Sequence, residues 1–362
     1  MLQKIKKIDG AIVVVLLLLM VISIFSIYSV THGREDLNGM HIKMIKFYIL
    51  GLVAFLGLTF IDYRLIVKYA LYIYITGIGI LVLVSFIGKT QNGAQGWLKF
   101  GGFSLQPAEL FKLILILFLA AVLVRKNKNR LLFWKDVVPL GLLTMLPFLL
   151  IGLLIIASTA AAGIMSYIHY HDQIKTFLTD IGRSHWVERF DPWLVPEKAT
   201  AKASYHTKNA KLAIASGGMS GEGYTQGSSV QTDRVPYTYS DSIFVQIAEE
   251  FGFVGSALLL LLYFILIHRM ILIALECKDR GGPFLIVGIV AMILYQIFEN
   301  IGAFIGLMPL TGITLPFVSF GGTSLLINMA SIGLVMSVRL HGREVEENLP
   351  TPAAYPAAAK QG

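Results

Sequence analysis

Residues 11–30 read AIVVVLLLLMVISIFSIYSV, twenty residues without a single charge. An α-helix rises 1.5 Å per residue, so a helix of this length crosses a hydrocarbon core about 30 Å thick. Lys4, Lys6 and Lys7 precede the run, as basic residues do in a signal peptide, but the run exceeds the usual apolar region of a signal and no small-residue cleavage site follows. We interpret residues 11–30 as a retained first membrane span.

The same apolar pattern recurs along the chain. Of the 362 residues, 56% are hydrophobic and 14% are charged, whereas a soluble domain has about 45–50% apolar and about 25% charged residues. This composition excludes a water-soluble globule. We predict an all-α polytopic membrane protein with one integral membrane domain over residues 1–362. Seven further apolar stretches bring the expected number of spans to eight: 46–61, 65–87, 110–124, 137–168, 243–267, 283–305 and 323–338.

The distribution of basic residues predicts which loops are cytoplasmic. Basic residues precede the first span, occupy the loops at 125–135 and 268–280, and follow the last span. The positive-inside rule makes these sides, and both termini, cytoplasmic. Segment 169–242, before the third-last span, is then a large extracellular loop. The net charge of +8 therefore reflects topology and gives no reason to expect nucleic-acid binding.

Two features of the spans and loops need separate interpretation. Stretch 137–168 would form a helix of about 48 Å, so we interpret it as one long or broken span. Cys277 is the only cysteine, which excludes an internal disulfide. The tail 345–362, rich in Ala and Pro, is predicted to be a disordered cytoplasmic segment.

Two loops combine glycine and proline with apolar side chains. Residues 91–109 read QNGAQGWLKFGGFSLQPAE, and residues 308–322 read MPLTGITLPFVSFGG. Irregular backbone cannot face lipid, so both loops are expected to dip into a cavity lined by protein. The alternative is an amphipathic loop at the membrane surface. The glycine-rich stretch 216–223 lacks the lysine of a phosphate-binding loop and is interpreted as a tight turn.

Ionisable residues at the span edges are candidates for function, because a charge at the membrane centre costs about 2.5–3.5 kcal/mol on insertion scales. Glu109 and Lys112 are three residues apart, on one helical face, and can pair. Glu249 lies just inside the sixth span and Glu299 in the seventh. Asp241 opens the sixth span, either as a helix N-cap or as a carboxylate at the mouth of an external cavity, where burial would raise its pKa toward that of a general base.

Five motifs, in this order, resemble those of the SEDS family (shape, elongation, division and sporulation), which includes FtsW, SpoVE and the RodA branch that the sequence resembles most. They are GAQGWLKFGGFSLQPAELFKL at 93–113, FDPW at 190–193, LAIASGGMSGEGYTQG at 212–227, DSIFVQIAEEFGFVG at 241–255 and FENIGAFIGLMPLTGITLPFVSFGGTSLL at 298–326.

The resemblance implies a SEDS-like helical bundle with peptidoglycan glycosyltransferase activity. Such an enzyme polymerises lipid II into glycan strands at the outer face of the bacterial cytoplasmic membrane, for cell wall synthesis, cell shape or cell division. Asp241 matches the family's proposed catalytic aspartate. No cofactor is assigned with certainty: cationic residues, or a divalent cation (Mg or Mn) bound with the diphosphate, would stabilise the leaving group, and no residue is assigned as a metal ligand. The candidate substrate-binding residues are Trp97, Lys99, Glu109, Lys112, Glu249 and Glu299, with Lys99 or Lys112 placed to meet the diphosphate.

The implied partners are lipid II, membrane lipids and a class B penicillin-binding protein, a transpeptidase whose single membrane helix would pack near the sixth and seventh spans. The sequence also departs from the family. The family has ten spans and a Pro-Asp-Leu-Gly motif that is absent here, with stretch 137–168 in its place, by deletion or by divergence. Glu222, Tyr237 and Tyr239 replace the family's Lys, Glu and His. Two alternatives therefore stay open: a catalytically impaired scaffold for the transpeptidase, and a lipid II flippase.

Overall fold

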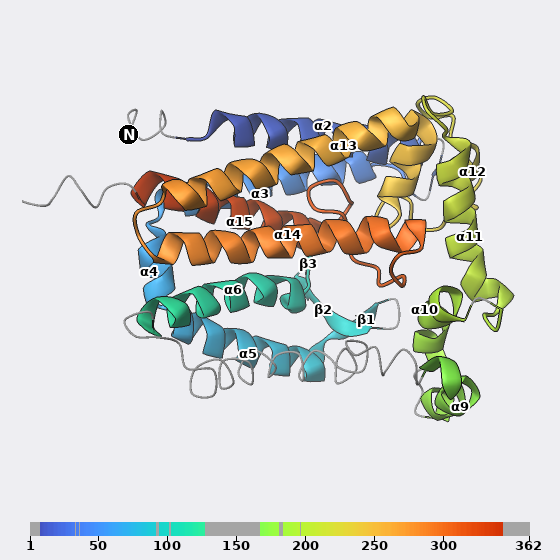
Figure 1. Ribbon diagram of the computed structural model, residues 1–362, viewed down its shortest axis with the longest axis horizontal. Helices are drawn as coiled ribbons and strands as arrows, with labels where there is room; N and C mark the ends of the chain where they lie inside the picture. The colour runs from blue at the N-terminus through green and yellow to red at the C-terminus, as the bar shows by residue number, and fades with distance from the viewer. Residues whose placement is uncertain are drawn as a thin grey trace, which may run out of the picture.

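The computed structural model describes residues 8–126, apart from 33, 36, 92–93 and 101–102, and residues 167–342, apart from 181–183 and 196. Long helices run side by side in a bundle, and a row of shorter helices lies across one end of it (Figure 1). One small sheet is the only strand structure in this described part of the chain. The predicted helical membrane fold is confirmed.

Six helices in the described residues are long and apolar enough to span a membrane, which makes the chain a multi-pass membrane protein. The expected third stretch, 65–87, divides at Tyr69 into α4 (Tyr63–Lys68) and α5 (Ala70–Ile87). Most of stretch 137–168 and all of the tail 345–362 lie outside the described residues, so the count of eight stays a prediction. The six helices are α2 (Gly10–Thr31), α3 (Met40–Phe60), α6 (Pro107–Lys126), α13 (Ile243–Glu276), α14 (Gly281–Ile305) and α15 (Gly322–His341).

The last span, α15, is the centre of the bundle. Of its span residues 83% are buried, against 28% in α3, which packs along it. The two helices approach closely because α15 has glycine at the contact: a Cβ on Gly333 would lie 2.6 Å from the carbonyl oxygen of Phe55. Small residues that let helix backbones approach are typical of membrane helix packing.

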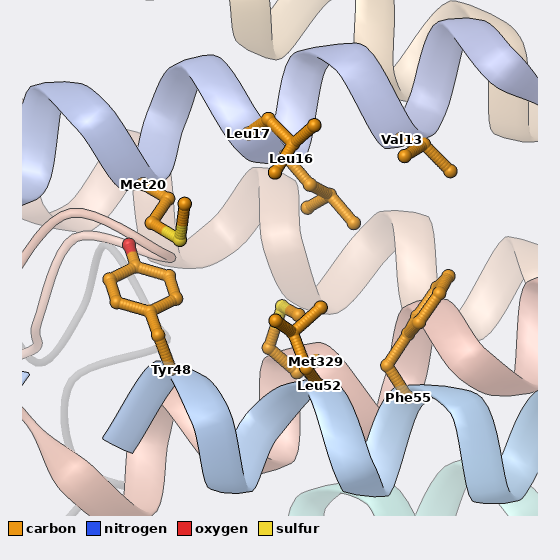
Figure 2. Close-up of a pocket in the computed structure, with 8 residues that line it drawn as sticks. All are labelled: Val13, Leu16, Leu17, Met20, Tyr48, Leu52, Phe55 and Met329. Atoms are coloured by element: carbon orange, nitrogen blue, oxygen red, sulfur yellow. The ribbon is translucent and has the colours of Figure 1, made fainter. Parts of the chain in front are cut away.

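Between α2 and α3 the packing leaves a small apolar pocket of about 40 Å³ (Figure 2). Met329 of α15 closes its inner side, and the exposed side chains of Leu17 and Leu52 place it toward the outside of the bundle. The lining residues are Val13, Leu16, Leu17, Met20, Tyr48, Leu52, Phe55 and Met329.

One buried carboxylate joins three spans at the end of the bundle opposite the row of short helices. Asp9 caps α2 by accepting hydrogen bonds from the N–H groups of Ala11 and Ile12, as N-cap residues do. The same carboxylate pairs with Arg269 of α13 at 2.5 Å and with Arg339 of α15 at 2.7 Å. Burial alone would raise the pKa of Asp9, but these arginines hold it below its ordinary value. We call this end the Asp9 end.

Helix α13 is kinked at Gly252, whose φ of 63° and ψ of −157° are accessible only to glycine. The glycine-rich loop predicted as a tight turn fills the kink. The N–H groups of Glu222 and Gly223 donate to the carbonyl oxygens of Glu249 and Glu250 at 2.9 and 3.1 Å. Side chains cannot fit there: a Cβ on Gly221 would lie 2.1 Å from the Glu250 carbonyl oxygen.

The structure agrees with the sequence-based expectation for one of the two irregular loops and not for the other. The irregular backbone expected for 91–109 is wrong: most of this stretch pairs into an antiparallel sheet of β1 (Lys89–Gln91), β2 (Ala94–Phe100) and β3 (Phe103–Leu105), in which backbone groups pair with one another. The loop between α14 and α15 has no helix or strand and passes into the bundle, where Leu315, Phe317 and Val318 are buried. For this loop the expectation is confirmed.

The segment expected as a large loop, 169–242, is mostly helical. It forms the row of short helices across the bundle end opposite Asp9 (Figure 1). These helices are α9 (His171–Asp180), α10 (Ser184–Leu194), α11 (Ala201–Ser216) and α12 (Ser228–Gln231). Because Asp241 follows them directly, we call this the Asp241 end.

The contact at Gly333 predicts a difference between two glycine substitutions. Gly333→Ala should destabilise the bundle by about 1–3 kcal/mol, because overpacking must push α3 away from α15. Gly57→Ala, on α3 and with open space at its Cβ position, should leave stability unchanged or raise it, since alanine favours helix. Thermal unfolding of the purified protein in detergent measures both. Equal melting temperatures for the two variants would contradict the packing assignment.

Candidate functional site

Asp241 lies in a turn rather than in a helix. The turn at 237–242 leads into α13, and the residue at the helix N-cap position is Ser242, not Asp241. The N-cap role considered for Asp241 is therefore wrong. Tyr237 opens the turn with a φ of +57°, a left-handed backbone that is unusual for a bulky residue. Such backbone persists only where the surrounding structure enforces it.

Three hydrogen bonds hold this turn, two of them from neighbouring elements. From α14, Asn300 donates a hydrogen bond to the Asp241 carbonyl oxygen at 2.7 Å. From the loop between α14 and α15, the Phe320 N–H donates to the Tyr239 carbonyl oxygen at 2.9 Å. Within the segment itself, the Ser242 hydroxyl donates to the Pro236 carbonyl oxygen.

The environment of the Asp241 carboxyl suits a general base. Burial raises its pKa to about 6, although a hydrogen bond from Ser240 and the charge of Arg189 act in the opposite direction. Gly312 lies directly against it, since a Cβ at that position would be 3.1 Å from Oδ2. A carboxylate with a pKa near 6 is largely ionised at neutral pH and is a stronger base than an exposed aspartate.

The dipeptide Thr311–Gly312 lies between several charged groups. Arg189 of α10 donates to the Thr311 carbonyl oxygen at 2.9 Å, and Glu299 of α14 has a hydrogen bond with the Thr311 side chain. Glu299 is 1% exposed, and its Oε2 has no hydrogen-bond partner among the described residues. The structure thus brings Glu299, a predicted substrate-binding residue, to the same short loop as Asp241.

The sequence missed three groups at this site. Arg189 directly precedes the FDPW motif but is not among the predicted site residues, and neither are Asn300 and His206. His206 of α11 lies 3.1 Å from the Ser242 hydroxyl, and burial lowers its pKa to about 4, so that it is neutral at physiological pH. No local sequence pattern indicates these contacts, because each contact joins segments that are far apart in the chain.

The predicted pair on the fourth span is confirmed. Lys112 Nζ lies 2.7 Å from Glu109 Oε2, and both side chains are partly buried. Helices α6 and α14 run antiparallel, because Val124 packs near Gly281 and Ile116 against Gly288. Equal rise along the two helices then places Glu109 and Lys112 at the Asp241 end of the bundle.

The remaining residues predicted on the loop at 91–109 are placed by the small sheet. Trp97 lies in β2, opposite Lys89 of β1, and is partly buried. Lys99 lies two residues further on, opposite Ser104 of β3, and its side chain falls outside the described part. The sheet is anchored to α15, since the Thr323 hydroxyl donates to the Ser104 carbonyl oxygen at 2.8 Å.

Glu249, predicted to bind substrate, has a different task. Its two carboxylate oxygens accept hydrogen bonds from the N–H groups of Ser229 and Val230, at 2.8 and 3.0 Å. Glu222 accepts from the N–H group of Ser228 at 2.8 Å. Both acids therefore cap the start of α12. Glu249 is fully buried, and both of its carboxylate oxygens accept hydrogen bonds within the protein, so a substrate cannot reach it. The substrate-binding assignment of Glu249 is wrong for this physical reason.

Removal of the Glu249 carboxylate tests the cap. Glu249→Ala leaves two buried N–H groups without a partner, at a cost of about 1–3 kcal/mol each, so the melting temperature should fall by several degrees. Glu222→Ala, at an exposed carboxylate, should cost less than half as much. Thermal unfolding in detergent gives the comparison, and a Glu249→Ala variant as stable as the parent would contradict the cap.

Comparison with known proteins gives consistent similarities over most of the chain. Residues 8–344 match the FtsW/RodA/SpoVE family model, described as a cell cycle protein. The chain is 34% identical to stage V sporulation protein E of Bacillus subtilis, over 73% of this chain and 76% of that protein. It is 30% identical to the peptidoglycan glycosyltransferase MrdB of Escherichia coli, over 94% of this chain and 96% of that protein.

Solved structures give a similar result. The rod shape determining protein RodA of Thermus thermophilus is 25% identical, with a TM-score of 0.64 and coverage of 93% of this chain and 98% of that chain. A chain from a peptidoglycan synthase complex, whose structure concerns the coordination of polymerisation and crosslinking, has a TM-score of 0.69 at 24% identity, with 93% and 99% coverage. This second likeness concerns the fold alone.

Proposed function

Because this chain belongs to the FtsW/RodA/SpoVE family, the SEDS family that its motifs resemble, we propose that it polymerises lipid II into the glycan strands of peptidoglycan. It is a peptidoglycan glycosyltransferase. The observation that supports the reaction at this site is the partly buried Asp241, with its raised pKa and with Arg189 close by.

The reaction needs a base and a way to stabilise a leaving diphosphate. A sugar hydroxyl attacks the anomeric carbon of a second lipid-linked sugar, the new C–O bond forms, and the bond to the diphosphate breaks. Asp241 takes the proton of the attacking hydroxyl, a role worth about 10²–10⁴-fold in rate. The diphosphate carries away the electron pair, and cationic groups stabilise that charge.

Arg189 is a better candidate for the diphosphate than Lys112. Lys112 is already paired with Glu109, whereas the exposed Arg189 uses Nη1 at the Thr311 carbonyl and has further N–H donors. A divalent cation, Mg or Mn, would add charge at the same place. The described residues contain no group of three or more His, Cys, Asp or Glu that could hold a metal, so such a cation would be bound largely by the diphosphate itself.

The proposed location is the bacterial cytoplasmic membrane, with both termini in the cytoplasm. Arg269 and Arg339 lie at the Asp9 end, and a basic end of a membrane bundle is typical of the cytoplasmic side. The Asp241 end then faces outward. This orientation gives the site access to a lipid-linked sugar in the outer leaflet.

The proposed partner is a class B penicillin-binding protein, which would supply crosslinking. The similar fold from a peptidoglycan synthase complex supports such a pairing. The outer faces of α13 and α14 offer apolar surface for a single membrane helix. Five large side chains on them are more than half exposed: Phe253, Leu261, Phe264, Tyr295 and Phe298.

Polymerisation of lipid II by the purified protein, with and without such a partner, tests the proposal. Wild-type protein should form glycan strands, and Asp241→Asn should lower the rate by about 10²–10⁴-fold. Asp180→Asn, at an exposed aspartate of α9, is the matched control and should be as active as wild type. Absence of glycan under every partner condition would favour the scaffold, and lipid II crossing vesicle membranes without polymerisation would favour the flippase.

The pKa of Asp241 predicts the pH dependence. The base must be ionised, so kcat/KM should be level above about pH 7 and fall about tenfold per pH unit below a midpoint near 6. An exposed aspartate would give a midpoint near 4. A profile of initial rates between pH 4.5 and pH 8 distinguishes the two, and a midpoint near 4 would contradict the buried environment described above.

A further inference from the structure

The position of Asp241 depends on contacts with other elements rather than on a helix. The turn at 237–242 makes two short-range backbone bonds, from the N–H groups of Ser240 and Ser242 to the Tyr237 carbonyl oxygen. Neither fixes the turn relative to the loop that carries Gly312. The Phe320 N–H binds the Tyr239 carbonyl oxygen from the far end of that loop, so a further group is needed near Gly312 itself if the carboxyl of Asp241 is to stay buried against it.

Asn300 is the group that bridges these segments. Its Nδ2 donates to the carbonyl oxygen of Asp241 and to the carbonyl oxygen of Ile313, both at 2.7 Å. One amide nitrogen thus joins the residue that carries the base to the residue that follows Gly312. The side chain is 2% exposed, so water does not compete for these hydrogen bonds.

The other atom of the amide shows what the side chain contributes. Asn300 Oδ1 is buried without a hydrogen-bond partner among the described residues, and an unpaired buried acceptor costs about 1–3 kcal/mol. The amide is thus an unfavourable group for packing alone. Its two N–H donors are what the site uses.

We propose that Asn300 is a positioning residue for catalysis: by binding the carbonyl oxygens of Asp241 and Ile313 together, it holds the Asp241 carboxyl in its buried, reactive position. The inference rests on the proposed function of Asp241 as the base. Asn300 does not contact the reacting atoms. It acts through the aspartate.

Loss of this bridge should loosen the site without unfolding it. Two other hydrogen bonds to the turn stay in place: the Phe320 N–H donates to the Tyr239 carbonyl oxygen, and the Ser242 hydroxyl donates to the Pro236 carbonyl oxygen. The carboxyl would then move away from Gly312 and gain water. A misplacement of about 1 Å in an active site can cost about 10²-fold in rate.

Several charged or titratable groups lie near Asp241 and could influence its titration in a pH measurement. Arg189 of α10 and Glu299 of α14 flank Thr311, and His206 of α11 lies at Ser242. His206, with a pKa of about 4, stays neutral in the range measured. None of these groups is changed when Asn300 is replaced, so a shift in the titration of Asp241 reports its own hydration.

Asn300→Leu removes both donors at similar volume, and Gln296→Leu is the matched control. Gln296 lies one turn earlier on α14, is equally buried and also has an unpaired amide oxygen. For Asn300→Leu we expect kcat to fall about 10–100-fold with KM for lipid II within twofold, and the acidic midpoint of kcat/KM to move from near 6 toward 4. Gln296→Leu should change kcat by less than threefold and leave the midpoint in place.

A second measurement does not need turnover. The protonated Asp241 carboxyl reacts with a water-soluble carbodiimide, and peptide mass spectrometry gives the extent of its modification at each pH. The midpoint should be near pH 6 in wild type and in Gln296→Leu, and lower in Asn300→Leu; Asp241→Asn controls for site specificity. An unchanged midpoint in Asn300→Leu would overturn the positioning role, whether or not glycan is made. A shifted midpoint in a protein that makes no glycan would support the positioning role and count against the proposed function.

Discussion

The kink of α13 is the constraint on which the arrangement of the Asp241 end depends. A break in a membrane helix frees carbonyl groups that lipid cannot satisfy. Here the backbone N–H groups of Glu222 and Gly223 satisfy the carbonyls of Glu249 and Glu250. The glycine-rich loop is thereby fixed to α13. Helix α12, which follows the loop, is also fixed to α13, because the Glu249 carboxylate accepts hydrogen bonds from the N–H groups of Ser229 and Val230 at the start of α12.

The same constraint sets the start of α13 and so the place where Asp241 can lie. From this fixed start, the turn at 237–242 reaches back to the loop between α14 and α15 and to Asn300. The base is thus placed by backbone groups and by the side-chain amide of Asn300, none of which contacts the reacting atoms. Two charged side chains, Arg189 and Glu299, then meet at Thr311 on the other side of the loop.

The sequence predicts the spans well and the polar contacts poorly, for a physical reason. Lipid imposes long apolar runs, which are visible without tertiary information, and α2 and α14 begin and end within two residues of the expected stretches. Helix α11 was expected to be loop because segment 169–242 contains no apolar stretch long enough to span a membrane, although the alanines and lysines of α11 favour helix. The glycines at 91–109 indicated irregular backbone, yet Gly96 lies within β2, which pairs with both β1 and β3. The role of Asn300 depends on two carbonyl oxygens distant in the chain, and no local pattern encodes that.

The burial of α15 has a consequence for biosynthesis. Among the six candidate spans of the described residues, this helix comes last in sequence and is the least apolar, yet it is the most buried. The earlier helix α3 packs along it, as does β3 through Thr323. Before α15 is inserted, the earlier spans lack the helix that they pack around. Their surfaces that later contact α15 must therefore not bind other proteins until that helix is in the membrane. Among the described spans, a single late helix therefore completes the bundle.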